Sequence, residues 1–146
     1  MATIAKKIFI NSPVGKVFSF VTSPDNWTKY VTSLTDVRDV SSQNVDPGTT
    51  FKWEYRMFGM NFRGKGQVIE NIKNRKFGLK MEGSFPIVEK YTFTPVDDGT
   101  ELLFELEYEV PGKLLGSIAN RVVIEKLNKK EAANVLSKVK TFCEEL

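Results

Sequence analysis

One carboxyl group stands out among the side chains of this sequence that can do chemistry. Ile87, Tyr91 and Phe93 set an alternation along one predicted strand, and Glu89 falls in the same phase. Side chains two residues apart in a strand point to the same face, so Glu89 is predicted to point inward. A buried lone carboxyl group is destabilising unless it has a partner or a task, which makes Glu89 a candidate ligand contact. Two other interpretations stay open: residues 85–86 (Phe-Pro) shift the register, or Glu89 lies at an exposed mouth.

Tyrosine hydroxyls are the other polar groups that the alternation turns inward. Tyr55, Tyr91 and Tyr108 share the phase of the apolar residues in their strands. Their hydroxyls can donate to or accept from a ligand oxygen, and a carboxyl group with a tyrosine can carry acid–base chemistry. Buried tyrosines with satisfied hydroxyls are nevertheless common in protein cores. These residues therefore permit an enzyme without requiring one.

The sequence lacks the residues that several common catalytic and metal-binding sites require. The sequence has no histidine, which removes the usual general base, the Ser-His-Asp arrangement and the commonest zinc ligand. The single cysteine, Cys143, lies on the apolar stripe of the last predicted helix and is interpreted as core. Residues 64–66 (Gly-Lys-Gly) lie in a strand pattern without the helix that a phosphate loop needs. We therefore expect no metal ion and no cofactor, and we assign no catalytic residue.

Length and composition favour one ordinary globular domain over residues 1–146. Hydrophobic residues make up 41% and charged residues 27% of the chain, and the net charge is +3. That mild, evenly spread charge does not predict a nucleic-acid partner. No signal peptide and no transmembrane segment are recognised, and one cysteine fits a reducing compartment, so a cytoplasmic location is expected.

The periodicity of apolar residues predicts a strand, two short helices, six strands and one long helix. The first strand is expected over 3–10, followed by helices that begin at Ser12 and Ser23, each an N-cap residue with a proline after it. The period then changes from 3.6 to 2 as far as Val110. Consecutive strands with helices at the ends predict an α+β fold with an antiparallel sheet of about seven strands.

A long C-terminal helix is predicted over 113–145, because no proline occurs there and apolar residues recur at helical spacing. The residues expected to be buried on it are Leu115, Ile118, Val122, Leu136, Val139 and Phe142. Its first part, 114–123 (LLGSIANRVV), is left open as packed helix, cavity lid, partner surface or site of transient membrane-surface contact.

The order of these elements resembles the START-like helix-grip superfamily of polyketide cyclases, pollen allergens and lipid-transfer domains. The similarity covers the whole chain and is carried by IFINSPVGKVFSFVTSPDNWTKYV, VDPGTTFKWEY, DDGTELLFELEYEV and VLSKVKTFCEEL. It implies a curved sheet with the long helix across its concave face and a cavity between them. It does not imply one activity, since this fold serves several.

Aromatic residues dominate the predicted concave face, which either fills a solid core or lines a cavity. Gly64 and Gly66 lie in inward register, where they leave room or let the strand bend. Given the resemblance, Trp53 and Tyr91 are expected to line a pocket of a few hundred Å³. The predicted ligand-binding residues are Phe51, Trp53, Tyr55, Phe62, Met81, Glu89, Tyr91, Phe93, Phe104, Tyr108, Ile118 and Val122.

Binding or carriage of a lipid-like, isoprenoid or aromatic small molecule is the function that these observations favour. Two alternatives stay open. One is a cyclase, dehydratase or isomerase that uses Glu89 and a tyrosine, and the other is a chaperone-activator-like protein-interaction module. An apolar patch outside the cavity would favour the interaction module.

Overall fold

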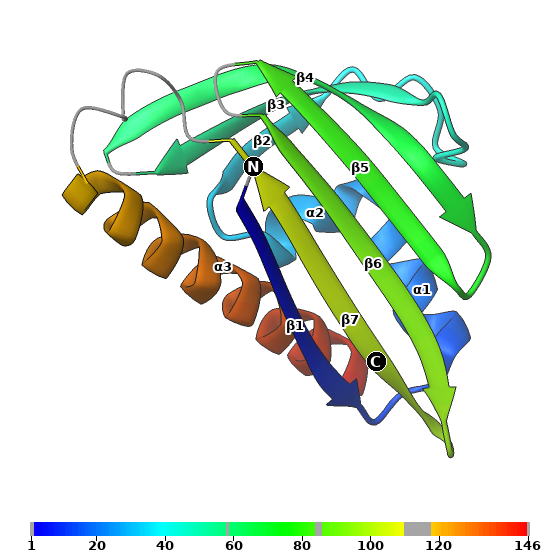
Figure 1. Cartoon of the computed structure of the whole chain (residues 1–146). Helices are drawn as coiled ribbons and strands as arrows, with labels where there is room; N and C mark the ends of the chain where they lie inside the picture. Colours follow the sequence, from blue (N-terminus) through cyan, green and yellow to red (C-terminus); the bar gives the residue numbers. More distant parts are fainter. Residues whose placement is uncertain (1, 58, 84–85, 110–117, 146) are drawn as a thin grey trace.

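The computed structural model describes residues 2–57, 59–83, 86–109 and 118–145 and confirms the predicted α+β fold. Within these ranges, seven strands and three helices follow one another in the expected order (Figure 1). They are β1 (Ala2–Ile10), α1 (Val14–Thr22), α2 (Pro24–Tyr30), β2 (Leu34–Arg38), β3 (Thr50–Met57), β4 (Met60–Ile72), β5 (Lys76–Gly83), β6 (Ile87–Val96), β7 (Gly99–Tyr108) and α3 (Ile118–Glu145).

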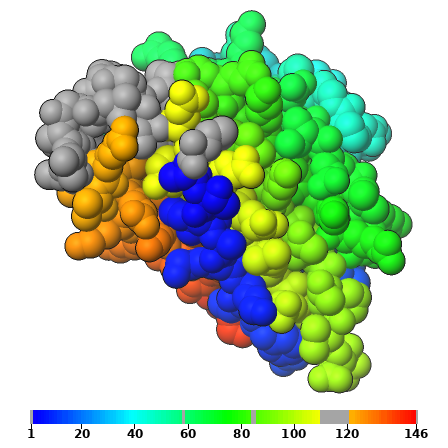
Figure 2. Space-filling model, in the orientation of Figure 1, coloured from blue at the N-terminus to red at the C-terminus, as the bar shows by residue number. Residues whose placement is uncertain are grey.

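The strands form one antiparallel sheet in the order β1-β7-β6-β5-β4-β3-β2. The first strand pairs with the last, so β1 and β2 are the two edges of the sheet. Figure 1 shows the sheet curling over α3, with α1 and α2 against the same concave side. In Figure 2, β1 lies on the surface between α3 and β7. The helices therefore cover one face and leave the other to solvent.

The period-2 pattern correctly identifies the inward face. Almost every aromatic or aliphatic side chain assigned to that face is buried, and only Met57 is half-buried. The buried members are Phe51, Trp53, Tyr55, Phe62, Leu79, Met81, Tyr91, Phe93, Phe104, Leu106 and Tyr108. Removal of this apolar surface from water is the main stabilising contribution to the fold.

Gly64 and Gly66 leave no room at the concave face, because aromatic rings already lie against them. A Cβ at Gly64 would be 2.8 Å from Cζ2 of Trp53 and 1.9 Å from the backbone oxygen of Glu82. A Cβ at Gly66 would be 2.4 Å from the ring of Phe51. The missing side chains therefore leave room for β3 rings and for the β5 backbone and not for a ligand, while the second interpretation, that these glycines let the strand bend, is not tested by these contacts.

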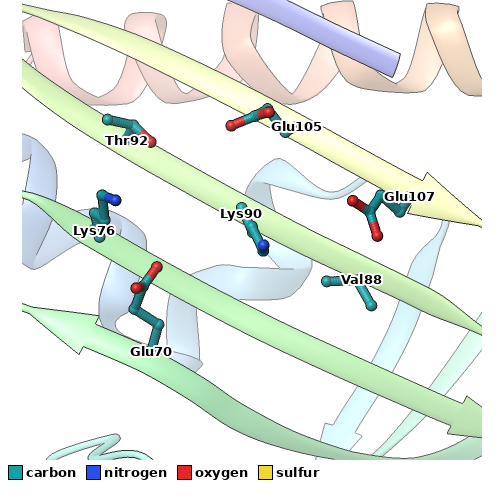
Figure 3. A pocket seen from close by; sticks show the side chains of 7 residues that line it. All are labelled: Glu70, Lys76, Val88, Lys90, Thr92, Glu105 and Glu107. Atoms are coloured by element: carbon teal, nitrogen blue, oxygen red, sulfur yellow. The ribbon is translucent and has the colours of Figure 1, made fainter. Parts of the chain in front are cut away.

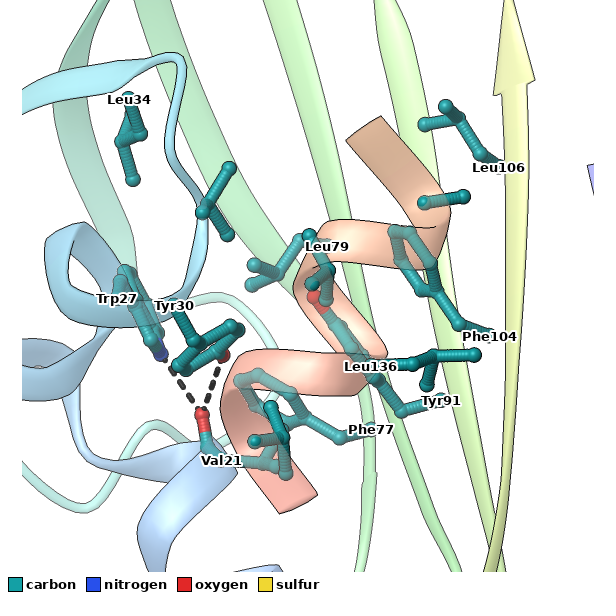
Figure 4. Packing of buried hydrophobic residues seen from close by; sticks show 14 of the residues in the cluster. Val21, Trp27, Tyr30, Leu34, Phe77, Leu79, Tyr91, Phe104, Leu106 and Leu136 are labelled. Atoms are coloured by element: carbon teal, nitrogen blue, oxygen red, sulfur yellow. Dashed lines mark hydrogen bonds between the residues drawn. The ribbon is translucent and has the colours of Figure 1, made fainter. Parts of the chain in front are cut away.

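The two short helices are held together by a shared acceptor. Trp27 Nε1 and the Tyr30 hydroxyl, both on α2, donate to the Val21 carbonyl oxygen of α1 at 3.0 and 2.8 Å (Figure 4). Ser23 is the N-cap residue of α2, as predicted. Ser12 is not the N-cap residue of α1: Pro13 takes that position, while the Ser12 carbonyl accepts from Thr100 Oγ1 at 2.9 Å.

Helix α3 confirms the predicted long helix over 118–145, whereas 113–117 lie outside the described residues. Its buried stripe is Ile124, Asn128, Ala132, Val135, Leu136, Val139 and Cys143. Val122, expected to be buried, is 48% exposed because it precedes Ile124 by two residues, which rotates it about 200° around the axis. Phe142, 37% exposed, is also less buried than expected, although its ring stacks on Phe20. Leu115 and the side chain of Ile118 lie outside the described part.

Close contacts of α3 are mainly with β1, α1 and α2, and less with β7. At the C-terminal end, the Asn11 backbone N–H donates to Glu144 at 2.7 Å, and Lys140 Nζ donates to the Phe9 carbonyl at 2.9 Å. Within the described ranges, no helix combines the length and apolar character needed to cross a membrane.

Substitution of two glycines tests the close packing of β3 on β4. Gly64→Ala should lower the free energy of unfolding by about 2 kcal/mol or more, because its Cβ collides with backbone as well as with Trp53. Gly15→Ala in α1 is the control: nothing lies within 4 Å of the added Cβ, and alanine in the first turn should leave stability unchanged or raise it slightly. Urea denaturation measures both. Equal stability of Gly64→Ala and wild type would contradict the packing.

Candidate functional site

Glu89 is buried on the concave face and is held by a residue from a distant strand. The Tyr55 hydroxyl on β3 donates to Glu89 Oε1 on β6 at 3.0 Å. Three strand spacings separate β3 from β6, or roughly 14 Å in a flat sheet. The contact therefore depends on the curl of the sheet, which brings the two side chains together. The inward orientation predicted for Glu89 is confirmed, with 4% of its surface exposed.

Two further tyrosines extend this polar group through the core. The Tyr91 hydroxyl lies within hydrogen-bonding reach of Glu89 and of Tyr30, which donates to the Val21 carbonyl. The Tyr91 ring stacks on Phe104 with centroids 4.7 Å apart. Burial, together with the negative charge of Glu89, raises the pKa of Tyr55, Tyr91 and Tyr30 well above the ordinary value. The three hydroxyls therefore keep their protons at neutral pH.

The pKa of Glu89 is raised from 4.5 to about 7. Burial is the main cause, because the carboxylate loses its hydration. Hydrogen bonds from Tyr55 and Tyr91 oppose the rise, whereas the negative charge of Glu131 adds to it. Glu89 is thus poised to gain or lose a proton near neutral pH.

Helix α3 completes the site from the opposite side. Asn128 and Glu131, one turn apart, line the same small cavity as Glu89 and Tyr55. Glu131 Oε1 accepts from the Ser33 backbone N–H at 3.0 Å. The cavity has a volume of about 20 Å³, room for a single water-sized group. Its walls are otherwise mainly apolar: Val31, Met57, Ile87, Phe104, Leu106 and Val135.

The structure brings together only part of the predicted site. Tyr55, Glu89 and Phe104 line the cavity. The remaining predicted residues of the sheet are buried in the core without lining it: Phe51, Trp53, Phe62, Met81, Tyr91, Phe93 and Tyr108. Val122 is exposed on the outer side of α3, and the side chain of Ile118 lies outside the described residues.

Among the cavities lined by described residues, none of a few hundred Å³ is lined by Trp53 and Tyr91, where such a pocket was expected. Trp53 lies over Gly64, its Nε1 donating to the Lys65 carbonyl at 3.0 Å. Tyr91 packs between Phe77 and Phe104. Phe77, Tyr91 and Phe104 lie close together beside α3 (Figure 4).

Two larger hollows lie away from Glu89. One, of about 210 Å³, lies on the outer face of the sheet and is lined by alternating charges, among them Glu70, Lys76, Lys90 and Glu105 (Figure 3). The other, of about 460 Å³, lies beside the turn between β4 and β5 and includes Phe93 in its wall. Outward charges of both signs are typical of a solvated sheet face, which accounts for the first hollow. Neither hollow is lined by Glu89, Tyr55 or Asn128.

Sequence reasoning missed the α3 side of the site. Asn128 lies four residues after Ile124 and four before Ala132, and therefore occupies a position of the buried stripe. A polar residue at that spacing was the available signal. Val122 and Val123 are apolar but exposed, so the spacing of apolar residues did not reveal which side of the helix faces the core.

Glu89 should make stability pH-dependent in a defined direction. The unfolded chain ionises this carboxyl group near 4.5 and the folded protein near 7, so the folded state holds the extra proton between these values. Stability should therefore fall as pH rises through this window and stay lower above it. Glu89→Gln cannot ionise, yet it still accepts from Tyr55. Its stability relative to wild type should grow by about 3 kcal/mol from pH 4.5 to about pH 8.

Denaturant titrations at several pH values measure this difference, with Glu105→Gln on the outward side of β7 as the control. A constant difference between Glu89→Gln and wild type across the window would contradict the assigned environment of Glu89.

Comparison with solved structures finds the same fold in proteins of low identity. TTHA0849 from Thermus thermophilus is 18% identical, with a TM-score of 0.81 over 96% of this chain and 95% of that one. Zhui aromatase/cyclase from a Streptomyces species is 10% identical, with a TM-score of 0.79 over 98% and 93%. Ara h 8.0201 is 12% identical, with a TM-score of 0.70 over 99% of each chain. Similarity at these identities establishes the fold alone.

Comparison with curated proteins gives no match. The sequence profile of one family, described as "Polyketide cyclase / dehydrase and lipid transport", matches residues 1–144. That match covers nearly the whole chain and agrees with the helix-grip architecture and with the apolar, aromatic space beneath α3. The chain belongs to the polyketide cyclase/dehydrase and lipid transport family.

Proposed function

We propose that residues 1–146 form one domain that binds a hydrophobic small molecule between the concave face and α3. The observation that carries this proposal is how α3 covers the sheet. Its close contacts are with the edge strand β1, with β7 and with the short helices, while large side chains span the distance to the middle strands. Because protein interiors are close-packed and ligand sites are usually largely pre-formed, binding here requires side chains beside the cavity of Tyr55, Glu89 and Asn128 to move.

The small volume of the cavity defines what binding requires. A space of about 20 Å³ holds one polar group of a ligand but not its skeleton. The skeleton must take the place of side chains such as Met57, which is half-buried in the cavity wall. Methionine is unbranched and moves between rotamers at little energetic expense. Ligand uptake therefore involves repacking at the boundary of β3, β6 and α3.

An enzyme acting on such a ligand is the second candidate. Glu89 favours it, since a carboxyl group with a pKa of about 7 can exchange a proton with a bound molecule. The name of the Zhui aromatase/cyclase records such an activity for that protein. A carrier needs only the hydrogen bonds of Glu89, whereas an enzyme needs its ionisation.

A protein-interaction module is the third candidate. Val122, Val123 and Leu127 expose apolar surface on the outer side of α3. These residues lie on one helix, and they would be the contact surface for a partner.

The expected cytoplasmic location remains a prediction.

Filling the cavity should block ligand binding. Nile red, a neutral apolar dye, should bind wild type with increased fluorescence. Val135→Phe adds a ring inside the cavity and should weaken binding by at least about tenfold. Val123→Phe, on the outer side of the same helix, is the matched control and should bind as wild type does.

Thermal denaturation establishes whether Val135→Phe is folded. If that variant is unfolded, Leu106→Phe replaces it, because this substitution fills the same cavity from the sheet side. Unchanged dye binding in a folded, filled variant would exclude this cavity as the binding site. Native mass spectrometry of the purified protein identifies any ligand retained from the cell.

Glu89→Gln tests whether binding is mainly apolar. The amide keeps the shape of the side chain and its acceptor oxygen toward Tyr55. For a carrier, dye affinity should change by less than about threefold, which is within the range of one modest hydrogen bond. Loss of affinity of about a hundredfold would contradict apolar binding as the main interaction.

A further inference from the structure

Asn128 carries a polar atom that the rest of the described protein leaves unpaired. Its side chain is 2% exposed, and Nδ2 is the only buried side-chain nitrogen or oxygen in the described ranges without a hydrogen-bond partner. An unpaired buried donor is destabilising, and each such group in a native structure calls for an explanation. A leucine at this position of the buried stripe would pack without that penalty. Asn128 is therefore placed where stability alone does not favour it.

The surroundings of Asn128 limit what can pair with it. It lines the 20 Å³ cavity together with the carboxyl groups of Glu89 and Glu131. The cavity wall contains no Lys or Arg among its described residues. A group bound there faces one free amide donor and two carboxyl groups that can accept.

We infer that this cavity recognises the hydroxyl group of an otherwise apolar ligand. Asn128 Nδ2 donates to the hydroxyl oxygen, and the hydroxyl donates to the carboxyl group of Glu89 or Glu131. One oxygen atom fits the volume, and a hydroxyl is both acceptor and donor. The inference rests on the function proposed above and adds the chemical class of the ligand.

Other polar groups match the cavity less well. A ligand carboxylate would place a further negative charge beside Glu89 and Glu131 with no cation to compensate it. An ammonium group can pair with the carboxyl groups, but it has no acceptor for Asn128 Nδ2. A hydrocarbon leaves Asn128 unpaired. Only a neutral group that both donates and accepts satisfies every side chain.

Four probes with one skeleton test the inference: 2-(2-naphthyl)ethanol, 2-naphthylacetate, 2-(2-naphthyl)ethylamine and 2-ethylnaphthalene. Competition with Nile red measures their affinities for the full chain. The alcohol should bind about fivefold to tenfold more tightly than the hydrocarbon, and the carboxylate more weakly than the hydrocarbon. Asn128→Leu should remove the advantage of the alcohol and leave the affinity of the hydrocarbon within about twofold.

Asn134→Leu is the matched control, because Asn134 lies on the same helix, is half-buried and does not line the cavity. It should keep the preference for the alcohol. Thermal denaturation provides a second measurement: the Tm of Asn128→Leu should be no lower than that of wild type, because its unpaired amide is gone.

Equal binding of alcohol and hydrocarbon would overturn the inference and leave apolar binding in place. Tighter binding of the amine or the carboxylate would also overturn it. Failure of all four probes and of Nile red to bind would overturn the proposed function and this inference together.

Discussion

The close approach of aromatic rings to glycines in the middle of the sheet is the constraint on which the remaining structure depends. Trp53 and Phe51 lie so near to Gly64 and Gly66 that no Cβ fits at either position. Gly64 pairs with Gly83 of β5, where a Cβ would again meet backbone, 2.6 Å from the Arg63 oxygen. Gly64 and Gly83 thus occupy positions of β4 and β5 where a side chain would collide with the backbone of the neighbouring strand. On the same strand as Trp53, Tyr55 reaches Glu89 across three strand spacings because the sheet is curled (Figure 1).

The polar side chains buried between the curled sheet and α3 lower the stability of the fold, so their presence needs a functional explanation. Glu89 is held by Tyr55 and Tyr91, yet its pKa of about 7 shows that these hydrogen bonds do not offset the loss of hydration. Asn128 faces it from α3 without a partner in the described protein. A carboxyl group and an amide in the same apolar cavity are easier to explain by a bound polar group than by folding, since apolar residues would pack there at lower energy.

The sequence predicted the sheet side of the site better than the helix side, for a physical reason. Strands alternate with a period of two, so a single run such as Ile87, Tyr91 and Phe93 determines which way Glu89 points. Helix α3 has apolar residues on both sides, with Val122 and Leu127 exposed and Ile124 buried, so its inward face could not be assigned from spacing. The volume of the cavity could not be predicted from the sequence for another reason. It depends on whether aromatic rings lie over glycines, and the pattern of residue types does not determine this.

Recognition and catalysis make different demands on the groups around Glu89. General acid–base catalysis works best with a group whose pKa lies near the operating pH. Tyr30, Tyr55 and Tyr91 all have a raised pKa and keep their protons, which leaves Glu89 as the group in this network that titrates near neutrality. Recognition of a hydroxyl group has no such requirement, because an amide donor and a carboxyl acceptor suffice in either protonation state of their neighbours. Recognition therefore uses every group in the cavity without any ionisation, whereas catalysis would need proton exchange between Glu89 and a second group, either Glu131 or a protonated tyrosine.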